Sequence, residues 1–237
     1  VLKALNNAKI VIFVSKYLFK KAKEIGYKKN NYYIIPNGID LDKFYIIKRD
    51  IILKNINFKS NMIYIGYIGN LLKVKGVDKL PGIFNKISQT INNICFVIIG
   101  NGVLKENIKN GLSSYNLLDK TIFTGGISND LIPYYLNAFD VLLIPSRNEG
   151  FPSILLECLA CGTPVIASNV GGIPEILINN MYGYLVNLND NFIEKFSEQT
   201  LKTINKNWNR ERIRKGIENY DWQNVIKKEI EIYKEIL

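Results

Sequence analysis

The sequence predicts an α/β fold with a doubly wound parallel sheet and C-terminal helices. From residue 62 onward, short runs of apolar, often β-branched residues alternate with longer segments of helical periodicity. Most of the short runs lack alternating polar residues, which is typical of strands covered on both faces. Strands and helices that alternate at this spacing form right-handed crossover units, so the strands should be parallel.

Six strands and five helices are expected in this central region. The expected strands are Met62–Gly69, Ile94–Gly100, Thr121–Gly125, Val141–Ser146, Pro164–Ser168 and Gly183–Val186. The expected helices are Gly76–Thr90, Leu104–Asn116, Asp130–Phe139, Pro152–Cys161 and Ile173–Ile178. Pro81 lies inside the first helical pattern, so that helix should begin late or bend there.

The two ends of the chain follow other patterns. Near the N-terminus we expect a short strand at Ile10–Val14, a basic helix at Lys16–Ile25 and a second short strand at Tyr32–Ile35. A turn at Pro36-Asn37-Gly38 should follow. Residues 39–60 are polar and predict an irregular connection. The last expected helix runs from Tyr220 to Leu237 with one apolar stripe, which is typical of a buried helix face. That stripe contains Trp222, Val225, Ile226, Ile230, Tyr233 and Ile236.

The composition excludes several kinds of chemistry. The 237 residues include no histidine, so a Ser-His-Asp triad, a Cys-His dyad and a His-ligated zinc or haem site are excluded. The net charge of +10 fits nucleic acid, an anionic membrane or a phosphorylated substrate, and charge alone does not choose among them. No RNA-binding aromatic signature or helix-turn-helix pattern stands out, so we expect no nucleic-acid partner. No apolar run reaches the roughly 18 residues that span a bilayer.

Cysteines and acidic pairs give little sign of a metal site. The three cysteines, Cys95, Cys158 and Cys161, are an odd number and cannot all pair, and such low use in a chain of this size fits a reducing, intracellular setting. Cys158 and Cys161 form a Cys-x-x-Cys pair, which we interpret as buried helical residues, with metal or redox chemistry as the alternative. Asp40 and Asp42 have Asp-x-Asp spacing but lie far from the strand ends, so we expect no metal there.

The loop after the expected strand Val141–Ser146 has the features of a phosphate-binding turn. Ligands of doubly wound sheets bind at the carboxyl ends of the strands. Pro152 suits the first helical position, where no hydrogen bond is lost, and Gly150 lets the backbone approach a ligand closely. The free N–H groups at the start of the next helix should therefore face a diphosphate without needing a metal.

Two glutamates flank this loop, eight positions apart. Glu149 precedes the helix and Glu157 lies inside it. A carboxylate accepts hydrogen bonds from paired hydroxyls, so one glutamate is suited to a sugar ring and the other to a ribose. The alternative is that both are ordinary exposed charges.

These residues carry a resemblance to a known family. Residues 145–168, PSRNEGFPSILLECLACGTPVIAS, resemble the Glu-x7-Glu signature of retaining GT-B glycosyltransferases of family 4, the glycosyl transferases of group 1. Gly171-Gly172-Ile173-Pro174-Glu175 is similar to the next loop of that family. Ile35-Pro36-Asn37-Gly38-Ile39-Asp40 is similar to the start of the linker between the two GT-B domains, and Trp222–Leu237 resembles the helix that crosses back onto the N-terminal domain.

The resemblance implies a domain organisation. Residues 1–38 would be the tail of an N-terminal acceptor domain with the start of the linker, and residues 39–60 the linker. Residues 61–216 would form the Rossmann-like nucleotide-sugar-binding domain, and residues 217–237 the C-terminal crossover helix. Most of the N-terminal domain would lie outside this chain.

A second motif matches the family and also departs from it. The family usually has Gly-Arg-Leu-x-x-x-Lys-Gly after its first strand here, where Arg and Lys neutralise the donor diphosphate. Lys75 and Gly76 match, but Asn70 replaces the arginine, and asparagine supplies neither charge nor a bidentate fork. The charge of the diphosphate would then be neutralised by Lys75 and the helix N-terminus, with Lys73 or Arg147 as further candidates.

The resemblance implies transfer of a sugar from a nucleotide-sugar donor to an acceptor, with retention and with no metal or other cofactor. The implied catalytic residues are Glu149 and Lys75. The implied donor-binding residues are Asn70, Lys75, Gly150, Phe151, Pro152, Ser153, Glu157, Gly100 and Gly125. The alternative, which Asn70 favours, is a non-catalytic nucleotide-sugar-binding partner subunit.

The acceptor side is expected to be a glycan or a lipid-linked saccharide. We expect a cytoplasmic protein, with peripheral contact to an anionic surface at the inner face of the membrane as a further hypothesis. Its basis is a cluster of lysines, for which a solvated helix face is the alternative: Lys20, Lys21, Lys23, Lys28 and Lys29. The missing domain would leave this chain able to bind donor but to transfer little sugar.

Overall fold

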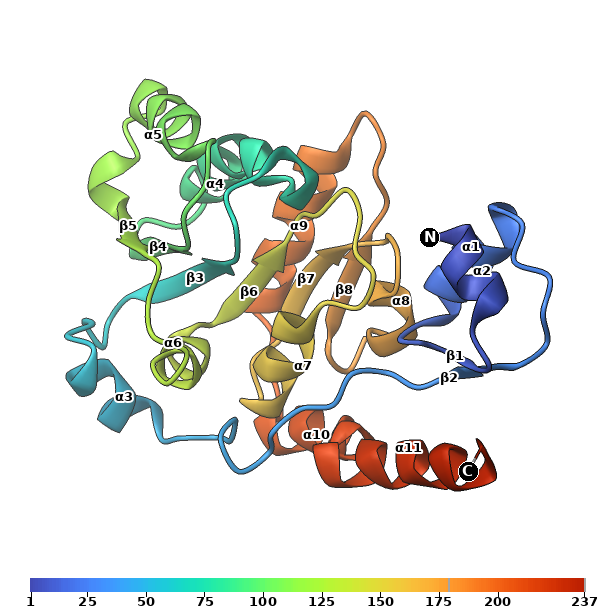
Figure 1. Ribbon diagram of the computed structural model, residues 1–237. Coiled ribbons are helices and arrows are strands. Elements are labelled where there is room, and N and C mark those ends of the chain that lie inside the picture. The colour runs from blue at the N-terminus through green and yellow to red at the C-terminus, as the bar shows by residue number, and fades with distance from the viewer. Residues whose placement is uncertain (179, 237) are drawn as a thin grey trace.

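A computed structural model describes residues 1–178 and 180–236 and contains a six-stranded parallel sheet (Figure 1). Its order is β5-β4-β3-β6-β7-β8. The strands are β3 (Ile63–Ile68), β4 (Ile94–Ile99), β5 (Thr121–Gly125), β6 (Val141–Ile144), β7 (Val165–Ser168) and β8 (Gly183–Val186). All six predicted strands are confirmed, as is the α/β fold with a parallel sheet. Because the strand order reverses between β3 and β6, their carboxyl ends flank the crevice where such sheets bind ligands.

Helices cover both faces of the sheet, so the predicted double winding is confirmed (Figure 1). One layer contains α4 (Leu80–Ser88), α5 (Lys105–Ser114) and α9 (Phe192–Ile204). The other contains α3 (Arg49–Asn55), α6 (Ile132–Ala138), α7 (Ser153–Ala160) and α10 (Arg210–Lys215). A short helix, α8 (Ile173–Ile176), follows β7. Each layer buries its own apolar cluster against one face of the strands.

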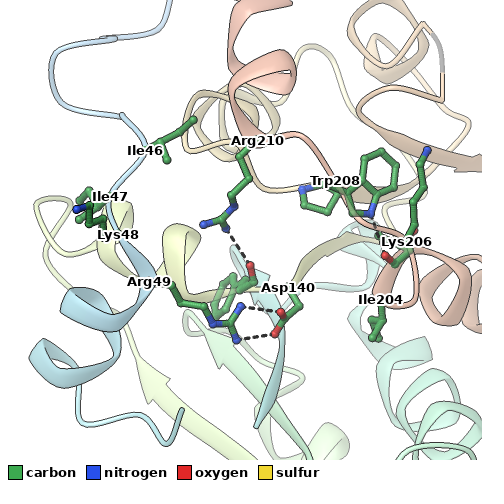
Figure 2. Close-up of a pocket in the computed structure, with 12 residues that line it drawn as sticks. Ile46, Ile47, Lys48, Arg49, Asp140, Ile204, Lys206, Trp208 and Arg210 are labelled. Carbon is green, nitrogen blue, oxygen red and sulfur yellow. Dashed lines mark hydrogen bonds and ion pairs between the residues drawn. The ribbon is translucent and has the colours of Figure 1, made fainter. Parts of the chain in front are cut away.

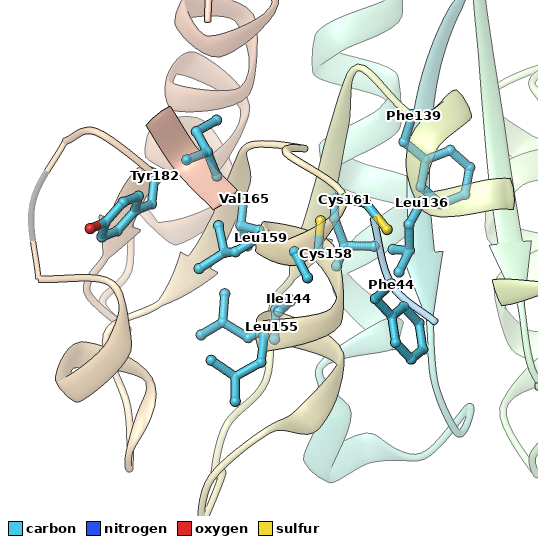
Figure 3. Packing of buried hydrophobic residues seen from close by; sticks show 14 of the residues in the cluster. Phe44, Leu136, Phe139, Ile144, Leu155, Cys158, Leu159, Cys161, Val165 and Tyr182 are labelled. Atoms are coloured by element: carbon cyan, nitrogen blue, oxygen red, sulfur yellow. The ribbon is translucent and has the colours of Figure 1, made fainter. Parts of the chain in front are cut away.

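The two cysteines of the Cys-x-x-Cys pair are part of the hydrophobic core. Cys158 and Cys161 are free thiols buried in the layer that contains α7 (Figure 3). Burial raises the pKa of Cys161 to about 12 and raises that of Cys158 well above its ordinary value. Both thiols therefore stay protonated and unreactive, which agrees with their interpretation as buried helical residues.

The first helix of the sheet region begins late, as Pro81 predicted. The pattern from Gly76 begins with a single 3₁₀ turn, Val77–Lys79, and continues as α4, which begins at Leu80 with Pro81 in its first turn. Gly76 has φ 70°, and a Cβ on it would lie 1.8 Å from the carbonyl oxygen of Pro145. Only glycine fits this close approach between the loops after β3 and β6.

The expectation of an irregular connection over residues 39–60 is wrong for its second half. Residues 49–55 form α3, in which Ile52 and Leu53 are buried. Arg49 at its start forms a bidentate ion pair with Asp140, with nitrogen–oxygen distances of 2.6 Å and 2.9 Å. The helix is thus held by contacts with residues far along the chain, which local polarity does not reveal.

The N-terminal segment forms a separate small layer. It consists of α1 (Leu2–Asn7), β1 (Val11–Phe13), α2 (Lys16–Glu24) and β2 (Tyr32–Ile34), and β1 and β2 pair in parallel. The last helix, α11 (Trp222–Ile236), runs beside β1 and β2 (Figure 1). Val225 and Ile232 of α11 are buried there.

The predicted apolar stripe of α11 is only partly buried. Val225 packs inside, but four of its members are between 42% and 55% exposed: Trp222, Ile226, Ile230 and Tyr233. The side chain of Ile236 lies outside the described residues. The small sheet offers a narrow apolar surface, with Ile10, Ile12 and Tyr33 packed on the cluster of Ile35, Val225 and Ile232. The buried face of α11 is therefore centred on Val225 and Ile232. Within the described part of the chain, no helix has the length and apolarity needed to cross a membrane.

Candidate functional site

A cavity of about 330 Å³ lies at the carboxyl ends of the central strands β3 and β6. Six of the predicted site residues line it: Asn70, Lys75, Pro152, Ser153, Glu149 and Glu157. They come from the loop after β3, the loop after β6 and the first turns of α7. The sheet therefore brings together two sequence segments that lie more than 70 positions apart, at the place where a doubly wound fold binds its ligand.

Lys75 and Glu149 form an ion pair in this cavity. The Lys75 Nζ lies 2.8 Å and 2.9 Å from the two carboxylate oxygens of Glu149. Ser146 donates its hydroxyl to the same carboxylate at 2.7 Å. Glu149 is only 8% exposed, so this pair is more strongly coupled than an ordinary surface ion pair.

The main chain of Glu149 is held by the loop after β7. Gly172 N–H donates to the Glu149 carbonyl oxygen at 3.1 Å. Gly171 has φ 61°, and a Cβ on it would lie 1.7 Å from that same oxygen. The two consecutive glycines thus let the two loops touch through their backbones, and this contact sets the direction of the Glu149 side chain.

The N-terminus of α7 faces the cavity. Pro152 is the N-cap, with an extended conformation, so α7 begins at Ser153, one position later than predicted. Ser153 and Ile154 line the cavity, and the first N–H groups of a helix have no partner inside the helix. Free amides and the positive end of the helix dipole therefore lie where an anionic group fits.

Glu157 lies one turn deeper in α7 and faces the same cavity. Burial raises its pKa from the ordinary 4.5 to about 7, although the Lys43 ammonium acts in the opposite direction. The eight-residue spacing therefore does place two carboxyl groups in one cavity. Their states differ: Glu149 is paired with a cation, whereas burial holds Glu157 partly protonated near neutral pH.

Two hydrogen-bonding residues of the cavity, Ser146 and Tyr67, are not among the residues that the sequence predicted. Ser146 is the hydroxyl partner of Glu149, and its position at the end of an expected strand was a usable signal. Tyr67 lies in β3 and donates its hydroxyl to the Asn70 carbonyl oxygen at 2.9 Å. Burial, together with the nearby Glu149, raises the pKa of Tyr67 further above its ordinary value, so the hydroxyl stays a donor. A tyrosine inside an apolar strand gives no sequence signal for such a role.

Four predicted donor-binding residues lie outside the lining of this cavity. Phe151 is buried on the far side of the loop, where its ring packs 6.1 Å from that of Tyr220. Gly150 faces Leu18, which a Cβ on it would approach to 3.3 Å. Gly100 donates its N–H to the Gly125 carbonyl oxygen at 2.8 Å, so these two glycines join neighbouring strand ends.

The further candidate cations do not reach the cavity. Arg147 forms a bidentate pair with Asp78 at 2.5 Å and 2.7 Å and also donates to the carbonyl oxygen of Lys73. The Arg147 guanidinium lowers the pKa of Asp78, and Asp78 raises that of Arg147. Arg147 therefore fastens the loop after β6 to the loop after β3, and Lys75 is the lysine among the cavity's lining residues.

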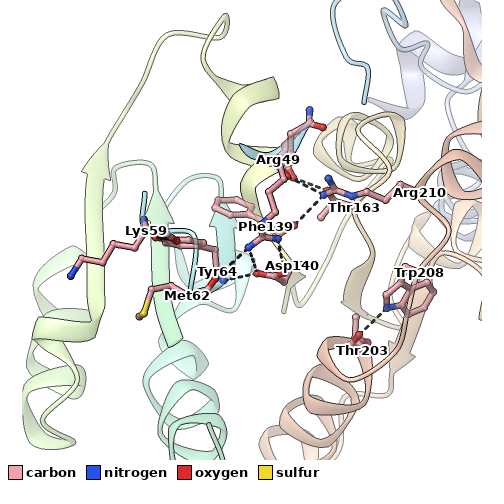
Figure 4. Close-up of polar contacts among 12 residues, drawn as sticks. Arg49, Lys59, Met62, Tyr64, Phe139, Asp140, Thr163, Thr203, Trp208 and Arg210 are labelled. Atoms are coloured by element: carbon pink, nitrogen blue, oxygen red, sulfur yellow. Dashed lines mark hydrogen bonds and ion pairs between the residues drawn. The ribbon is translucent and has the colours of Figure 1, made fainter. Parts of the chain in front are cut away.

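A second cavity, of about 400 Å³, lies near the amino ends of β6 and β7, where Arg49, Asp140 and Arg210 line it (Figure 2). Its two arginines are engaged within the protein, as Figure 4 shows for Arg49 on Asp140. Arg210 donates to the Phe139 carbonyl oxygen and, at 2.8 Å, to the Thr163 hydroxyl, and burial lowers the pKa of Arg210. This cavity is therefore a structural junction between α3, α10 and the sheet.

The Asp-x-Asp pair of Asp40 and Asp42 belongs to a local turn. An Asp40 carboxylate oxygen accepts the amides of Asp42 and Lys43 at 3.0 Å and 2.9 Å, which makes a local turn. Across the described ranges 1–178 and 180–236, no group of three or more Cys, Asp or Glu residues is placed to hold a metal ion.

The chain is similar to known proteins in sequence and in fold. Residues 48–220 match the family model described as "Glycosyl transferases group 1". Among curated proteins, an Escherichia coli UDP-Gal:alpha-D-GlcNAc-diphosphoundecaprenol alpha-1,3-galactosyltransferase is 36% identical over 165 residues, which are 66% of this chain and 41% of that protein. The chain thus spans less than half the length of that relative.

Solved structures show the same fold. Sucrose-phosphate synthase from Thermosynechococcus elongatus superposes with a TM-score of 0.84 and 25% identity, over 99% of this chain and 60% of that one. Anabaena HepE, solved in complex with UDP and glucose, superposes with a TM-score of 0.81 and 21% identity, over 99% of this chain and 66% of that one.

Proposed function

The chain belongs to the group 1 glycosyl transferases, and we propose that it forms the donor-binding part of an enzyme that transfers a sugar from a nucleotide-diphosphate sugar to an acceptor. One observation carries the proposal. Lys75, Glu149 and Glu157 line a single cavity at the N-terminus of α7, between the strands where the sheet order reverses. The name of the Escherichia coli relative, a UDP-Gal-dependent transferase, supports a nucleotide-sugar donor.

The donor diphosphate is proposed to bind between Lys75 and the first amides of α7. As the bond to the sugar breaks, negative charge grows on the departing diphosphate, and donors already in place stabilise it. The Lys75 ammonium has three N–H groups, and Ser153 and Ile154, the first two residues of α7, line the same cavity. This supply of positive charge is our reason for proposing transfer without a metal ion.

Glu149 is proposed to position the donor sugar. Its carboxylate is directed by Ser146 and Lys75, and its main chain by Gly172, so its orientation is fixed before any ligand arrives. A carboxylate fixed beside the diphosphate site accepts hydrogen bonds from sugar hydroxyls and sets which face of the reacting carbon is open. Retention is proposed on the Glu-x7-Glu signature and not on this geometry.

Glu157 is proposed to bind the ribose hydroxyls. It lies one turn further along α7 than Ser153 and lines the same cavity. Two vicinal hydroxyls donating to its carboxylate favour the charged form, so binding should lower the pKa that burial has raised. We propose in addition that the acceptor is a glycan or a lipid-linked saccharide. The lysine cluster of Lys20, Lys21, Lys23, Lys28 and Lys29 is proposed to make a peripheral contact with an anionic membrane from the cytoplasm.

Isothermal calorimetry of the intact protein with UDP-, GDP- and ADP-sugars tests the donor site. Lys75→Ala should weaken binding of the preferred donor by about a hundredfold, since a charge-assisted phosphate contact is lost. Lys73→Ala is the matched control, because Lys73 is exposed, is close in sequence and does not line the cavity. Equal effects of the two variants, or failure of all donors to bind, would refute the site.

Measuring sugar transfer distinguishes the proposed enzyme from a non-catalytic partner subunit. A partner subunit would bind donor but transfer no sugar without a companion chain. The intact protein, purified alone, should transfer sugar to a mixture of saccharide and lipid-linked acceptors or hydrolyse the donor slowly. Tight donor binding with neither reaction would favour the partner-subunit reading.

A further inference from the structure

Glu175 caps a helix that is far away in the sequence. Its Oε2 accepts the amide of Lys16 and its Oε1 accepts the amide of Tyr17, both at 2.9 Å. The next amide, of Leu18, donates to the Ser15 hydroxyl at 3.1 Å. The first three amides of α2 therefore all have side-chain acceptors, and two of them are supplied from α8, next to the cavity loop.

A carboxylate is the chemically suited group at this place. Both oxygens of Glu175 are used, whereas glutamine would offer one acceptor oxygen and one NH₂ donor. Hydrogen bonds from a helix N-terminus to an ionised acceptor are charge-assisted, and the helix dipole favours the negative charge there.

The same turn of α2 contacts the residues on both sides of Glu149. The Tyr17 hydroxyl donates to Asn148 Oδ1 at 3.0 Å. Leu18 packs where a Cβ on Gly150 would lie only 3.3 Å from its Cδ1. The residues that immediately precede and follow Glu149 are thus both touched by the helix that Glu175 holds.

We propose that Glu175 is a positioning residue for the cavity. By fixing the first turn of α2 against Asn148 and Gly150, it holds the loop that presents Glu149 to Lys75. It also sets the N-terminal segment of the chain at a fixed orientation to the donor cavity. The inference rests on the proposed function only for its turnover measurement, because the loop contact itself is independent of any ligand.

Glu175→Gln in the intact protein tests this role by amide hydrogen exchange and by kinetics. We expect faster exchange both in residues 15–19 and in the loop 146–153, and kcat about tenfold lower with donor KM changed less than about twofold. Glu24→Gln is the matched control: it removes a carboxylate from the same helix, where Glu24 pairs only with Lys21 at 2.7 Å on the surface. It should leave exchange in the loop and kcat unchanged.

Tyr17→Phe is a milder second variant, since it removes only the hydroxyl that reaches Asn148. It should raise exchange in the loop while leaving the first turn of α2 protected. A merely local cap predicts a different pattern for Glu175→Gln, with faster exchange in residues 15–19 only and normal kcat, and that pattern would overturn the proposal. If the wild-type protein transfers no sugar, the proposed function fails, and exchange in the loop alone decides the role of Glu175.

Discussion

The Lys75 ammonium nitrogen lies within 2.9 Å of both carboxylate oxygens of Glu149, a residue 74 positions later in the chain. The cation proposed to meet the diphosphate is therefore also the counter-ion of the acid proposed to position the sugar. Any anion that approaches Lys75 competes with Glu149 for its N–H groups, while any loss of Lys75 leaves a buried carboxylate without its cation. Binding of the leaving group and placement of the sugar are thus linked through one ion pair.

Glu149→Gln should separate these two effects. The variant keeps the size of the side chain and an acceptor for Ser146, but it releases the Lys75 ammonium to the diphosphate. We expect donor affinity to stay within about threefold of wild type and turnover of the intact protein to fall by a factor of about a hundred or more. Calorimetry and initial rates check this. A parallel loss of donor binding would mean that Glu149 acts mainly by holding the donor.

Asn70→Arg should strengthen donor binding. Asn70 is exposed at the end of β3 and lines the cavity, so a longer side chain has room to reach the diphosphate. Arginine adds a charge and a bidentate fork, worth about tenfold in affinity at low salt. The gain should shrink as ionic strength rises, because exposed charges are screened. Asn70→Gln, which lengthens the side chain without charge, is the control. Equal affinity of all three proteins would place the diphosphate away from Asn70.

Glu157 should make stability depend on pH. Its pKa is about 7 in the folded protein, against an ordinary value of 4.5, so the folded state holds this proton more tightly than the unfolded chain. Its contribution to stability is therefore greatest at low pH and is lost as pH rises from 4.5 to 7. The free energy of unfolding of wild type should fall relative to Glu157→Gln over this range, by at most about 3 kcal/mol.

Urea unfolding at several pH values measures the difference in free energy of unfolding between wild type and Glu157→Gln. This difference should become constant above pH 7, where Glu157 is ionised in both the folded and the unfolded state. Glu194→Gln, at a carboxylate half exposed on α9, is the control for the loss of a glutamate from a helix. A flat difference between wild type and Glu157→Gln would show that water reaches Glu157 and keeps its pKa ordinary.

Those parts of the fold that depend on local pattern could be predicted, whereas those fixed by distant contacts could not. The six strands are runs of β-branched residues, and the segment after β6 contains Gly150, Pro152 and the two glutamates. The strands and this part of the site could therefore be predicted from the sequence. Helix α3 could not be predicted in this way, because Arg49 at its start is held by Asp140, 91 positions away. The partner of Arg147 and the buried face of α11 were missed for the same reason.

Gly171→Ala should disrupt the placement of Glu149 from a loop that does not touch Lys75. At φ 61° a new Cβ would lie 1.7 Å from the Glu149 carbonyl oxygen, so the backbone of one loop has to move. We expect a loss of about 2 kcal/mol or more in stability and a clear loss of turnover. Gly82→Ala is the control, because its Cβ would meet only the end of the Ile193 side chain, at 3.2 Å, and because alanine favours the helix. Thermal unfolding and initial rates compare the two. Wild-type turnover in Gly171→Ala would mean that the loop after β7 does not direct Glu149.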